Sequence, residues 1–377
     1  MESPLSGLNE ARPLRHGFTT GACAAAAARG AALMLTGQAV VNAVTITLPG
    51  GAEAAFQLHG QRFSADTASC HVVKDAGDDP DVTNGAEVRA EVSRSPLAPS
   101  AFEGVSRITI SGGVGIGRVT KPGLAIPPGA WAINPVPLSM IEEAVGTVPA
   151  EFSLPPSAFS VVISIADGEE RALKTLNARL GIIGGLSILG TTGIVRPISA
   201  QAWTDTIDAA LDVARACGCE TVILSTGRSS ELAAQKHVNG LSGQILPEEA
   251  YIMMGDHLAH AVRACAERGF MRPSIACQFA KLLKIACGHE NTHAAVSELD
   301  LAVLHRWATE GGLPEEITAL IARANTAREV AVESGFDNRL MELVICRAGR
   351  AVRDHLPEIR ANFMLCGYDG STIISVW

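Results

Sequence analysis

The sequence predicts a two-domain protein of α/β plus α+β class: an N-terminal mixed α+β domain and a C-terminal domain with a Rossmann-like, doubly wound parallel sheet. The chain has 377 residues, which is more than a single hydrophobic core usually holds. Hydrophobic residues make up 47% of the chain and aromatic residues only 4%, a composition that suits closely packed α/β layers. Strand patterns predominate in the first half, whereas strand and helix patterns alternate in the second.

The first element expected is a helix in the alanine-rich segment that follows Phe18. Thr19 or Thr20 can cap its N-terminus, and Gly37 stands where a helix C-terminal glycine belongs. Four strands are expected after this helix, at residues 40–48, 54–58, 87–92 and 106–111.

The middle of the chain is rich in proline, and its last cluster, Pro155 and Pro156, is the expected domain boundary. We therefore expect domains at 14–155 and 156–377. The second should begin with a βαβ unit made of an apolar run at 159–165, a helix at 168–179 and a second apolar run ending at Leu189. The elements expected after it are a helix at 200–217, strands at 221–224 and 250–254, a helix ending at 268, a strand near 275, helices over 297–355 and two terminal strands over 361–377.

Composition and charge exclude several classes of protein. No apolar run approaches the length of a membrane span, and the N-terminus lacks a signal-peptide pattern, so we expect a cytoplasmic protein without a membrane partner. The nine cysteines are odd in number and scattered, which argues against a disulfide framework. The net charge of −9 and the absence of a concentrated basic face argue against a nucleic-acid partner.

Three loops that follow expected strands could hold a cofactor, because open α/β sheets bind ligands at the carboxyl ends of their strands. Glycine lets a ligand approach the main chain, and an acidic side chain can accept hydrogen bonds from ribose hydroxyls. The alternative for each loop alone is a helix cap with a tight turn. The candidate cofactor residues are Asp167 in the first loop, Gly190, Thr191, Thr192 and Gly193 in the second, and Ser225, Thr226 and Gly227 in the third.

A further glycine cluster, ITISGGVGIGRVTKPG, follows the expected strand at 106–111. A phosphate-binding glycine loop must open a helix, whereas Pro122 and Gly123 favour a turn here, so a dinucleotide loop is not expected. The expected use is close approach of the backbone to a bulky ligand, with Arg118 and Lys121 available for carboxylates.

Two polar segments allow more than one interpretation. HVVKDAGDDPDVTNG carries Asp75 and Asp78 and could bind a ligand directly, or be an acidic turn that holds backbone amides. HENTH, residues 289–293, matches the zinc-hydrolase pattern, but Gly288 stands where the zinc-binding helix should already be established. The alternatives for HENTH are a loop in a ligand cleft and a structural turn.

Six motifs occur in a fixed order along the chain. They are GFTTGACAAAAA (17–28), KDAGDDPDVTNG (74–85), GGVGIGRVTKPGLAIPPG (112–129), INPVP (133–137), NARLGIIGGLSILGTTGIVRP (177–197) and NTH (291–293). Together they resemble the cobalt-precorrin-5B C1-methyltransferase family of cobalamin biosynthesis, and the resemblance covers about residues 14–370, nearly the whole chain.

The resemblance implies methyl transfer from S-adenosylmethionine to C1 of a tetrapyrrole, with cobalt belonging to the substrate and no metal bound by the protein. We expect the cofactor on the three loops described above, and the macrocycle between the domains, because clefts at domain interfaces are common ligand sites. Asp75, Asp78 or His293 could relay a proton. The candidate substrate-binding residues are Thr19, Thr20, Gly113, Gly115, Arg118, Lys121 and Arg196.

Two other functions stay open at this point. One is a zinc hydrolase that uses His289, Glu290 and His293, and the other is a non-catalytic tetrapyrrole-binding protein of the pathway. The sequence also leaves open whether the substrate carries cobalt, and whether the chain forms a homo-oligomer.

Overall fold

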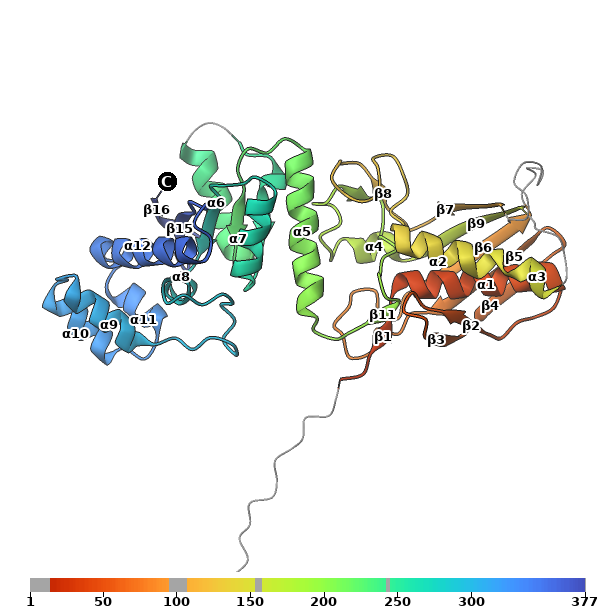
Figure 1. Cartoon of the computed structure of the whole chain (residues 1–377), viewed down its shortest axis with the longest axis horizontal. Helices are drawn as coiled ribbons and strands as arrows, with labels where there is room; N and C mark the ends of the chain where they lie inside the picture. The colour runs from red at the N-terminus through yellow and green to blue at the C-terminus, as the bar shows by residue number, and fades with distance from the viewer. Residues whose placement is uncertain (1–13, 95–106, 153–157, 242–244, 377) are drawn as a thin grey trace, which may run out of the picture. The chain divides into compact units, whose positions relative to one another are not determined.

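The computed structural model describes residues 14–94, 107–152, 158–241 and 245–376, which form two compact units (Figure 1). The first unit comprises the described residues up to Lys121 together with Ala125–Ser199. The second comprises Pro122–Leu124 and the described residues from Ala200 onward. Each unit has its own hydrophobic core, and both contain helices and strands.

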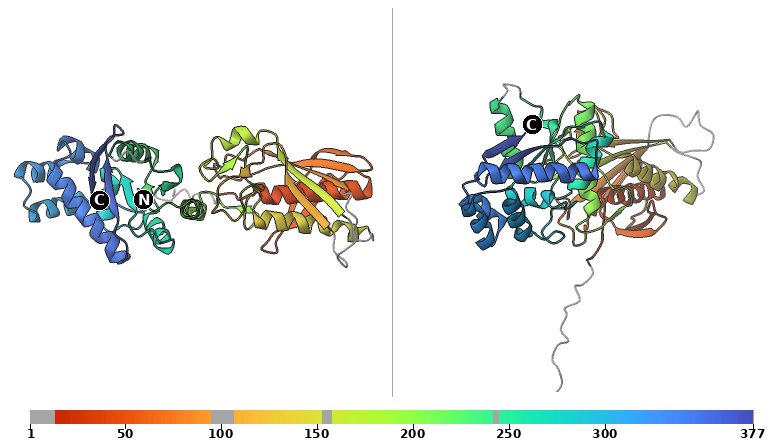
Figure 2. Two further views of the ribbon diagram at one scale, coloured as in Figure 1. Left: turned by 90° about the horizontal axis from the view of Figure 1, so that it is seen from above. Right: turned by 60° about the vertical axis from the view of Figure 1, so that its left-hand side comes forward.

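The first unit is built on a five-stranded sheet in the order β4-β5-β6-β9-β7, in which β7 and β9 are parallel and the other pairs are antiparallel. The helices α1 and α2 pack side by side against it (Figure 2). The elements of this unit are β1 (Gly17–Phe18), α1 (Thr20–Gly37), β2 (Ala43–Thr47), β3 (Glu53–Gln57), β4 (His59–Phe63), β5 (Thr67–Val73), β6 (Glu87–Arg94), β7 (Arg107–Gly112), β8 (Arg118–Val119), α2 (Pro135–Gly146), α3 (Val148–Glu151), β9 (Ala158–Ile165), α4 (Gly168–Ala172), β10 (Ile182–Ile183) and β11 (Ile194–Val195).

The start of α1 confirms the expected cap. Thr19 has an extended backbone, and its Oγ1 accepts a hydrogen bond from the N–H of Ala22 at 3.2 Å. The expected role of Gly37 is wrong: Gly37 is the last helical residue. The left-handed residue that ends the helix is Gln38, with φ of 49°, and its N–H donates to the carbonyl of Met34.

The second unit is built on a five-stranded sheet in the order β13-β12-β14-β15-β16, in which only β16 is antiparallel to its neighbour. Its elements are α5 (Ala200–Ala216), β12 (Ile223–Ser225), α6 (Arg228–Leu241), the 3-10 helix η1 (Glu248–Ala250), β13 (Tyr251–Met253), α7 (Leu258–Glu267), β14 (Ser274–Cys277), α8 (Phe279–Ala286), α9 (Leu301–Glu310), α10 (Glu315–Arg323), α11 (Ala327–Glu333), α12 (Asn338–His355), β15 (Asn362–Cys366) and β16 (Thr372–Val376).

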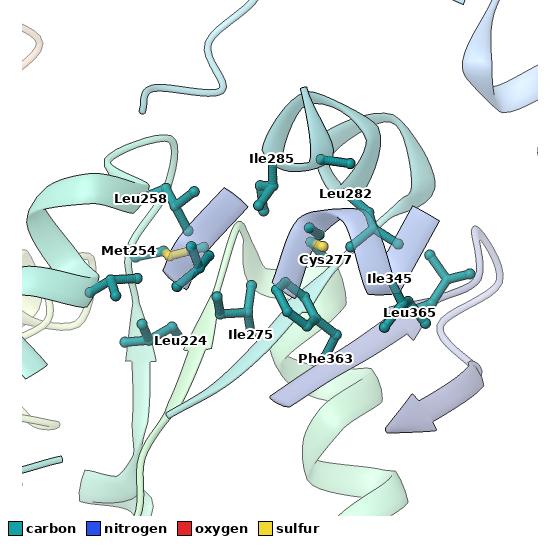
Figure 3. Packing of buried hydrophobic residues seen from close by; sticks show 14 of the residues in the cluster. Leu224, Met254, Leu258, Ile275, Cys277, Leu282, Ile285, Ile345, Phe363 and Leu365 are labelled. Atoms are coloured by element: carbon teal, nitrogen blue, oxygen red, sulfur yellow. The ribbon is translucent and has the colours of Figure 1, made fainter. Parts of the chain in front are cut away.

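Both faces of this second sheet are covered, because successive residues of its strands point to opposite sides. On one face Leu224 and Ile275 join a large core with residues of α7, α8 and α12 (Figure 3). On the other face Ile223 and Ala276 join a smaller cluster with residues of α6. A sheet buried on both faces explains why its strands read as continuous apolar runs.

Strand β9 corrects the expected domain division. It was expected to open the second sheet, but it pairs with β6 and β7 in the first. Every second β9 residue, from Phe159 to Ile165, is buried, because that face of the sheet joins one core with α1 and α2. The alternation does not show from the sequence which sheet the strand joins. The expected boundary at 155/156 falls within residues 153–157, outside the described residues, whereas the units divide between Ser199 and Ala200.

The rest of the expected βαβ unit is also shorter than predicted. The helix expected at 168–179 is α4, which ends at Ala172, and the second apolar run forms only the two-residue β10, antiparallel to β8. In the part of the chain that the structure describes, no helix is long and apolar enough to cross a membrane.

Candidate functional site

The carboxyl ends of β12, β13, β14 and β15 lie at one edge of the second unit's sheet, which we call the carboxyl edge. Strand β12 lies between β13 and β14, so the chain moves from β12 to one side and then returns to the other. Open parallel sheets bind ligands outside the carboxyl ends at such a reversal. The residues that follow these strands are therefore the first candidates for a cofactor site.

The predicted residues Ser225, Thr226 and Gly227 lie at this edge, at the end of β12. Ser225 is fully buried, and its hydroxyl donates to the carbonyl of Ile252 at 3.2 Å, so it holds two strands together. The Oγ1 of Thr226 lies 3.3 Å from the Oγ of Ser230. A Cβ built on Gly227 would meet no heavy atom within 4 Å, so the backbone there faces open space.

The loop after β12 carries a buried carboxylate that the sequence analysis did not single out. Glu231 is fully buried in the first turn of α6. It forms an ion pair with Arg228, whose side chain is 55% exposed, and accepts a hydrogen bond from Gln235 at 3.4 Å. Because an unpaired buried carboxylate is costly, this pair fixes the guanidinium of Arg228 beside Gly227.

Asp256 follows β13 at the same edge and is a second acidic residue that was missed. Its Oδ1 accepts hydrogen bonds from Thr292 Oγ1, at 2.7 Å, and from Lys281 Nζ. Burial by itself raises the pKa of Asp256, but the hydrogen bonds from Lys281 and Thr292 outweigh it and hold the pKa below its ordinary value. Asp256 is therefore an ionised carboxylate, and Gly255 before it, with φ of 58°, faces open space.

The NTH motif is joined to Asp256, so it also lies at the carboxyl edge. Thr292 is fully buried; its N–H donates to the carbonyl of Asp256 at 3.0 Å, and its carbonyl accepts from Lys281 and Lys284 at 2.9 and 3.1 Å. His293 is exposed, and its Nδ1 accepts the N–H of Ala295 at 3.2 Å. Burial lowers the pKa of Lys284.

Residues 289–293 contain no helix, so His289 and His293 do not share one helix face as the zinc-hydrolase pattern requires. Glu290, the base of that pattern, lies instead 3.7 Å from His355 Nδ1. The segment is not helical, so the zinc-hydrolase alternative is not favoured, and a place for this segment in a ligand cleft stays a prediction.

The other predicted residues lie in the first unit, where three distant motifs meet. Strand β1 pairs with β11, and the N–H of Phe18 donates to the carbonyl of Asp75 at 2.8 Å. The hydroxyl of Thr20 donates to the carbonyl of Leu189 at 3.3 Å and accepts its N–H at 3.0 Å. The motifs at 17–28, 74–85 and 177–197 are thus one interlocked structure.

The loop at 190–193 is part of this interlock. A Cβ on Gly190 would overlap the side chain of Thr19, and the carbonyl of Gly193 accepts the N–H of Thr19 at 3.0 Å. Thr192 bonds back to the main chain of Ile194, and Thr191 is exposed. Thr19, Thr20, Gly190 and Gly193 therefore serve the packing of the chain.

Asp75 and Asp78 hold the segment before β1. Asp75 forms an ion pair with Arg15, and Asp78 Oδ2 accepts the backbone N–H of Arg15 at 2.7 Å. The hydrogen bond from Arg15, with that from Gly77 N–H, lowers the pKa of Asp75. A carboxylate stabilised in its ionised form is a weak proton acceptor, which argues against Asp75 as a general base.

The same segment contains a buried ion pair. Lys74 is almost fully buried, and its Nζ donates to Asp81 Oδ2 at 2.6 Å. Burial by itself raises the pKa of Asp81, but the hydrogen bonds from Lys74 and Thr83 lower it more, so the net pKa is below its ordinary value.

The glycine cluster after β7 packs against its own unit. A Cβ on Gly113 would overlap the side chain of Ser164, and one on Gly115, where φ is 73°, would overlap the carbonyl oxygen of Ile165. The prediction that this cluster approaches a bulky ligand is therefore not needed to explain Gly113 and Gly115, because neighbouring atoms of the same unit leave no room for a side chain at either position.

The predicted polar residues of the first unit differ in how strongly the chain engages them. Asp167 accepts from Arg171 Nε at 2.7 Å, and Lys121 Nζ donates to the carbonyl of Arg179 at 3.2 Å. Arg118 donates to the carbonyl of Gly129 and stacks on Trp131, 3.8 Å from the ring centroid. Arg196 is exposed just after β11.

The predicted cofactor residues are thus divided between the units, because Asp167 and Gly190–Gly193 belong to the first and Ser225–Gly227 to the second. The sequence signal for the missed Asp256 was an acidic residue directly after an apolar strand, the same signal that pointed to Asp167. Asp256 went unnoticed because no glycine-rich motif surrounds it.

Comparisons with known proteins agree along the chain. Residues 8–197 match the CbiD family and residues 291–377 match the CbiD C-terminal domain. A protein of Pelobacter propionicus named cobalt-precorrin-5B C(1)-methyltransferase is 58% identical, over 96% of this chain and 95% of its own length. One of Geobacter metallireducens with the same name is 57% identical, over 96% and 98%.

Among solved structures, the crystal structure of cobalamin biosynthesis protein (cbiD) from Archaeoglobus fulgidus is 27% identical in sequence. The structural match covers 80% of this chain and 85% of the Archaeoglobus protein, with a TM-score of 0.38.

Proposed function

The chain belongs to the CbiD family, and from this premise we propose that it transfers a methyl group from S-adenosylmethionine to C1 of cobalt-precorrin-5B in cobalamin biosynthesis, giving cobalt-precorrin-6A. The observation that carries the proposal is the agreement of the relatives. Those that are 57 to 58% identical across 96% of this chain are each named cobalt-precorrin-5B C(1)-methyltransferase. The chain is a C-methyltransferase, and cobalt enters with the substrate.

We place the cofactor at the carboxyl edge of the second unit, which extends the Rossmann-like interpretation of this sheet. Two observations support this site. The backbone at Gly227 and Gly255 faces open space, so a ligand can approach the main chain there without displacing a side chain. Asp256 is an ionised carboxylate at the end of the second strand in chain order, where ribose hydroxyls find an acceptor in dinucleotide-binding sheets.

Bound there, S-adenosylmethionine supplies an electrophilic sulfonium methyl group. The task of the protein is then to orient the donor and acceptor and to exclude water, which requires few acid or base residues. Thr226 and Gly227 offer a hydroxyl and open main chain, and Asp256 offers its Oδ2. We withdraw Asp167, Gly190 and Gly193 from the cofactor site, because contacts within the first unit explain them.

For the macrocycle we retain two cations of the first unit. Tetrapyrrole precursors carry several carboxylates, and arginine binds carboxylates with two parallel hydrogen bonds. Arg196 is exposed, and the stacking of Arg118 on Trp131 leaves its guanidinium 3.8 Å from the ring centroid at the surface of the unit. Asp75 and Asp78 are no longer proposed as proton relays.

The test is to incubate the purified protein with S-adenosylmethionine carrying ¹³C in its methyl group and with cobalt-precorrin-5B, and to locate the label by NMR. The proposal expects the label on C1. A label on another ring carbon would refute the regiochemistry, and binding of the tetrapyrrole without any transfer would favour a non-catalytic binding protein.

A further inference from the structure

The NTH turn of the second unit carries hydrogen-bond donors that the proposed function does not yet use. Its central residue is fixed on every polar atom: the N–H, the carbonyl and the hydroxyl of Thr292 all have partners within the unit. A turn whose middle residue is buried and bonded in this way holds the two flanking side chains, Asn291 and His293, in place.

The hydrogen bonds of those flanking side chains define which of their atoms remain available. The Oδ1 of Asn291 accepts the backbone N–H of His293 at 2.8 Å, so its side-chain amide N–H groups stay available as donors. The Nδ1 of His293 accepts the N–H of Ala295 at 3.2 Å. An imidazole that accepts at Nδ1 is neutral with its proton on Nε2, because Nδ1 cannot carry a proton and accept at once.

This tautomer changes the role that the sequence suggested for His293. A neutral imidazole with its proton on Nε2 and its other nitrogen occupied cannot take up a proton from a substrate. It can donate a hydrogen bond. Neither Nε2 of His293 nor the amide nitrogen of Asn291 donates a hydrogen bond to another described residue, so both donors are available to a ligand.

The charges around the turn do not oppose an anion. Two ammonium groups, of Lys281 and Lys284, donate to the carbonyl of Thr292, and Asp256 forms an ion pair with Lys281. The neighbouring carboxylate, Glu290, lies beside His355. The two ammonium groups balance the two carboxylates, so the uncharged N–H donors of Asn291 and His293 lie beside a turn with no excess negative charge.

We infer that the NTH turn binds a carboxylate through the side-chain N–H groups of Asn291 and His293, with His293 as a neutral donor. The inference rests on the proposed function, because the carboxylate would belong either to the methionine part of the cofactor or to an acetate or propionate of the tetrapyrrole. Its connection to Asp256 places the turn at the carboxyl edge, beside the proposed cofactor site.

The first test is binding, measured by calorimetry with S-adenosylmethionine and with its decarboxylated analogue. A hydrogen bond to a charged group predicts that the wild-type protein prefers the carboxylate form by about tenfold or more. His293→Ala should lose that preference, and His293→Gln should keep most of it, since Gln supplies an N–H donor. His289→Ala, an imidazole removed outside the turn, should change nothing.

A second arm identifies the other source of the carboxylate. If S-adenosylmethionine binds equally to the wild type and to His293→Ala, the inference expects His293→Ala to raise the KM for the tetrapyrrole about tenfold with little change in kcat. The inference is overturned if His293→Ala alters neither the preference for carboxylate-bearing cofactor nor the affinity for the tetrapyrrole.

A third readout needs no ligand and separates this inference from the proposed function. In long-range ¹H–¹⁵N spectra of histidine-labelled protein, the signals lost in His293→Ala should show the Nε2–H tautomer at neutral pH. An Nδ1–H tautomer or an imidazolium would refute the donor role. Methyl transfer by the same wild-type preparation tests the proposed function independently, so either can fail without the other.

Discussion

The two units use glycine for different purposes, although the sequence presents their glycine-rich loops alike. In the first unit, a Cβ on Gly115 or Gly190 would overlap atoms of the same unit. At the carboxyl edge of the second unit, a Cβ on Gly227 or Gly255 would meet no atom within 4 Å. The first pair of glycines allows close packing within the unit, whereas the second pair leaves main chain open to a ligand.

The comparison teaches that a glycine–threonine loop after a strand is not by itself a cofactor site. The two regions differ in whether their polar groups have hydrogen-bond partners within the chain. The hydroxyls of Thr19 and Thr20 form hydrogen bonds with main-chain atoms of the first unit. Both hydrogen bonds to the Asp256 side chain end on Oδ1, so among the described residues no donor reaches its Oδ2, at an edge where parallel strands end.

The strongest way to break this comparison is Gly115→Ala. The new Cβ would overlap the carbonyl oxygen of Ile165, and the left-handed backbone at φ of 73° adds strain. We expect destabilisation of about 4 kcal/mol or loss of folded protein, measured by urea denaturation. A change below about 1 kcal/mol would show that the first unit's glycines are not needed for packing.

The next largest effect is expected from Asp81→Asn. This change leaves the buried ammonium of Lys74 without its carboxylate, which should cost about 3 kcal/mol of unfolding free energy.

The same ion pair makes the stability of the protein depend on pH. The folded pKa of Asp81 is below its unfolded value of about 3.9, so its contribution is fully present above about pH 4 and is lost as the pH falls through the folded pKa. Unfolding measured from pH 6 to pH 2 should show that Asp81→Asn loses less stability in acid than the wild type. Parallel curves would contradict this account of the buried pair.

How much of this could be predicted from the sequence differs between local and distant features. The cap at Thr19 and the helix at 200–216 follow from local pattern, and the sequence predicted both. The pairing of β9 with β6 and β7 depends on residues about 70 and 50 positions away, which an alternating apolar run does not specify.

The candidate site follows the same division. The loop after β12 and the NTH turn were predicted from the sequence, because strand ends and unusual motifs can be recognised from the local order of residues. It did not show that Thr292 bonds to Asp256, or that Lys281 and Lys284 converge on the turn. Those contacts depend on the order of the strands, which places the ends of β13 and α8 beside the turn.

A smaller effect is expected from Gly227→Ala at the carboxyl edge of the second unit. Gly227→Ala places a methyl group in open space, so stability should change by less than about 0.5 kcal/mol. The affinity for S-adenosylmethionine, measured by calorimetry, should fall about tenfold, because the methyl group occupies space that the ligand needs. Unchanged affinity would remove Gly227 from the proposed site.

The smallest effect is expected from Asp75→Asn, which removes an ion pair with Arg15 in which both side chains are about half exposed. Exposed pairs contribute little, so the loss should be below about 1 kcal/mol. The pH profile of methyl transfer should keep its shape. If the variant's rate of methyl transfer no longer rose or fell with pH where that of the wild type does, Asp75 would again be a candidate proton relay.

The central claim is that the carboxyl edge of the second unit, and not the glycine-rich loops of the first, holds the cofactor. Hydrogen–deuterium exchange of the full chain with and without S-adenosylmethionine tests this claim most directly. The account predicts new protection at residues 225–231 and 254–257. Protection confined to residues 166–170 and 189–193 of the first unit would contradict it.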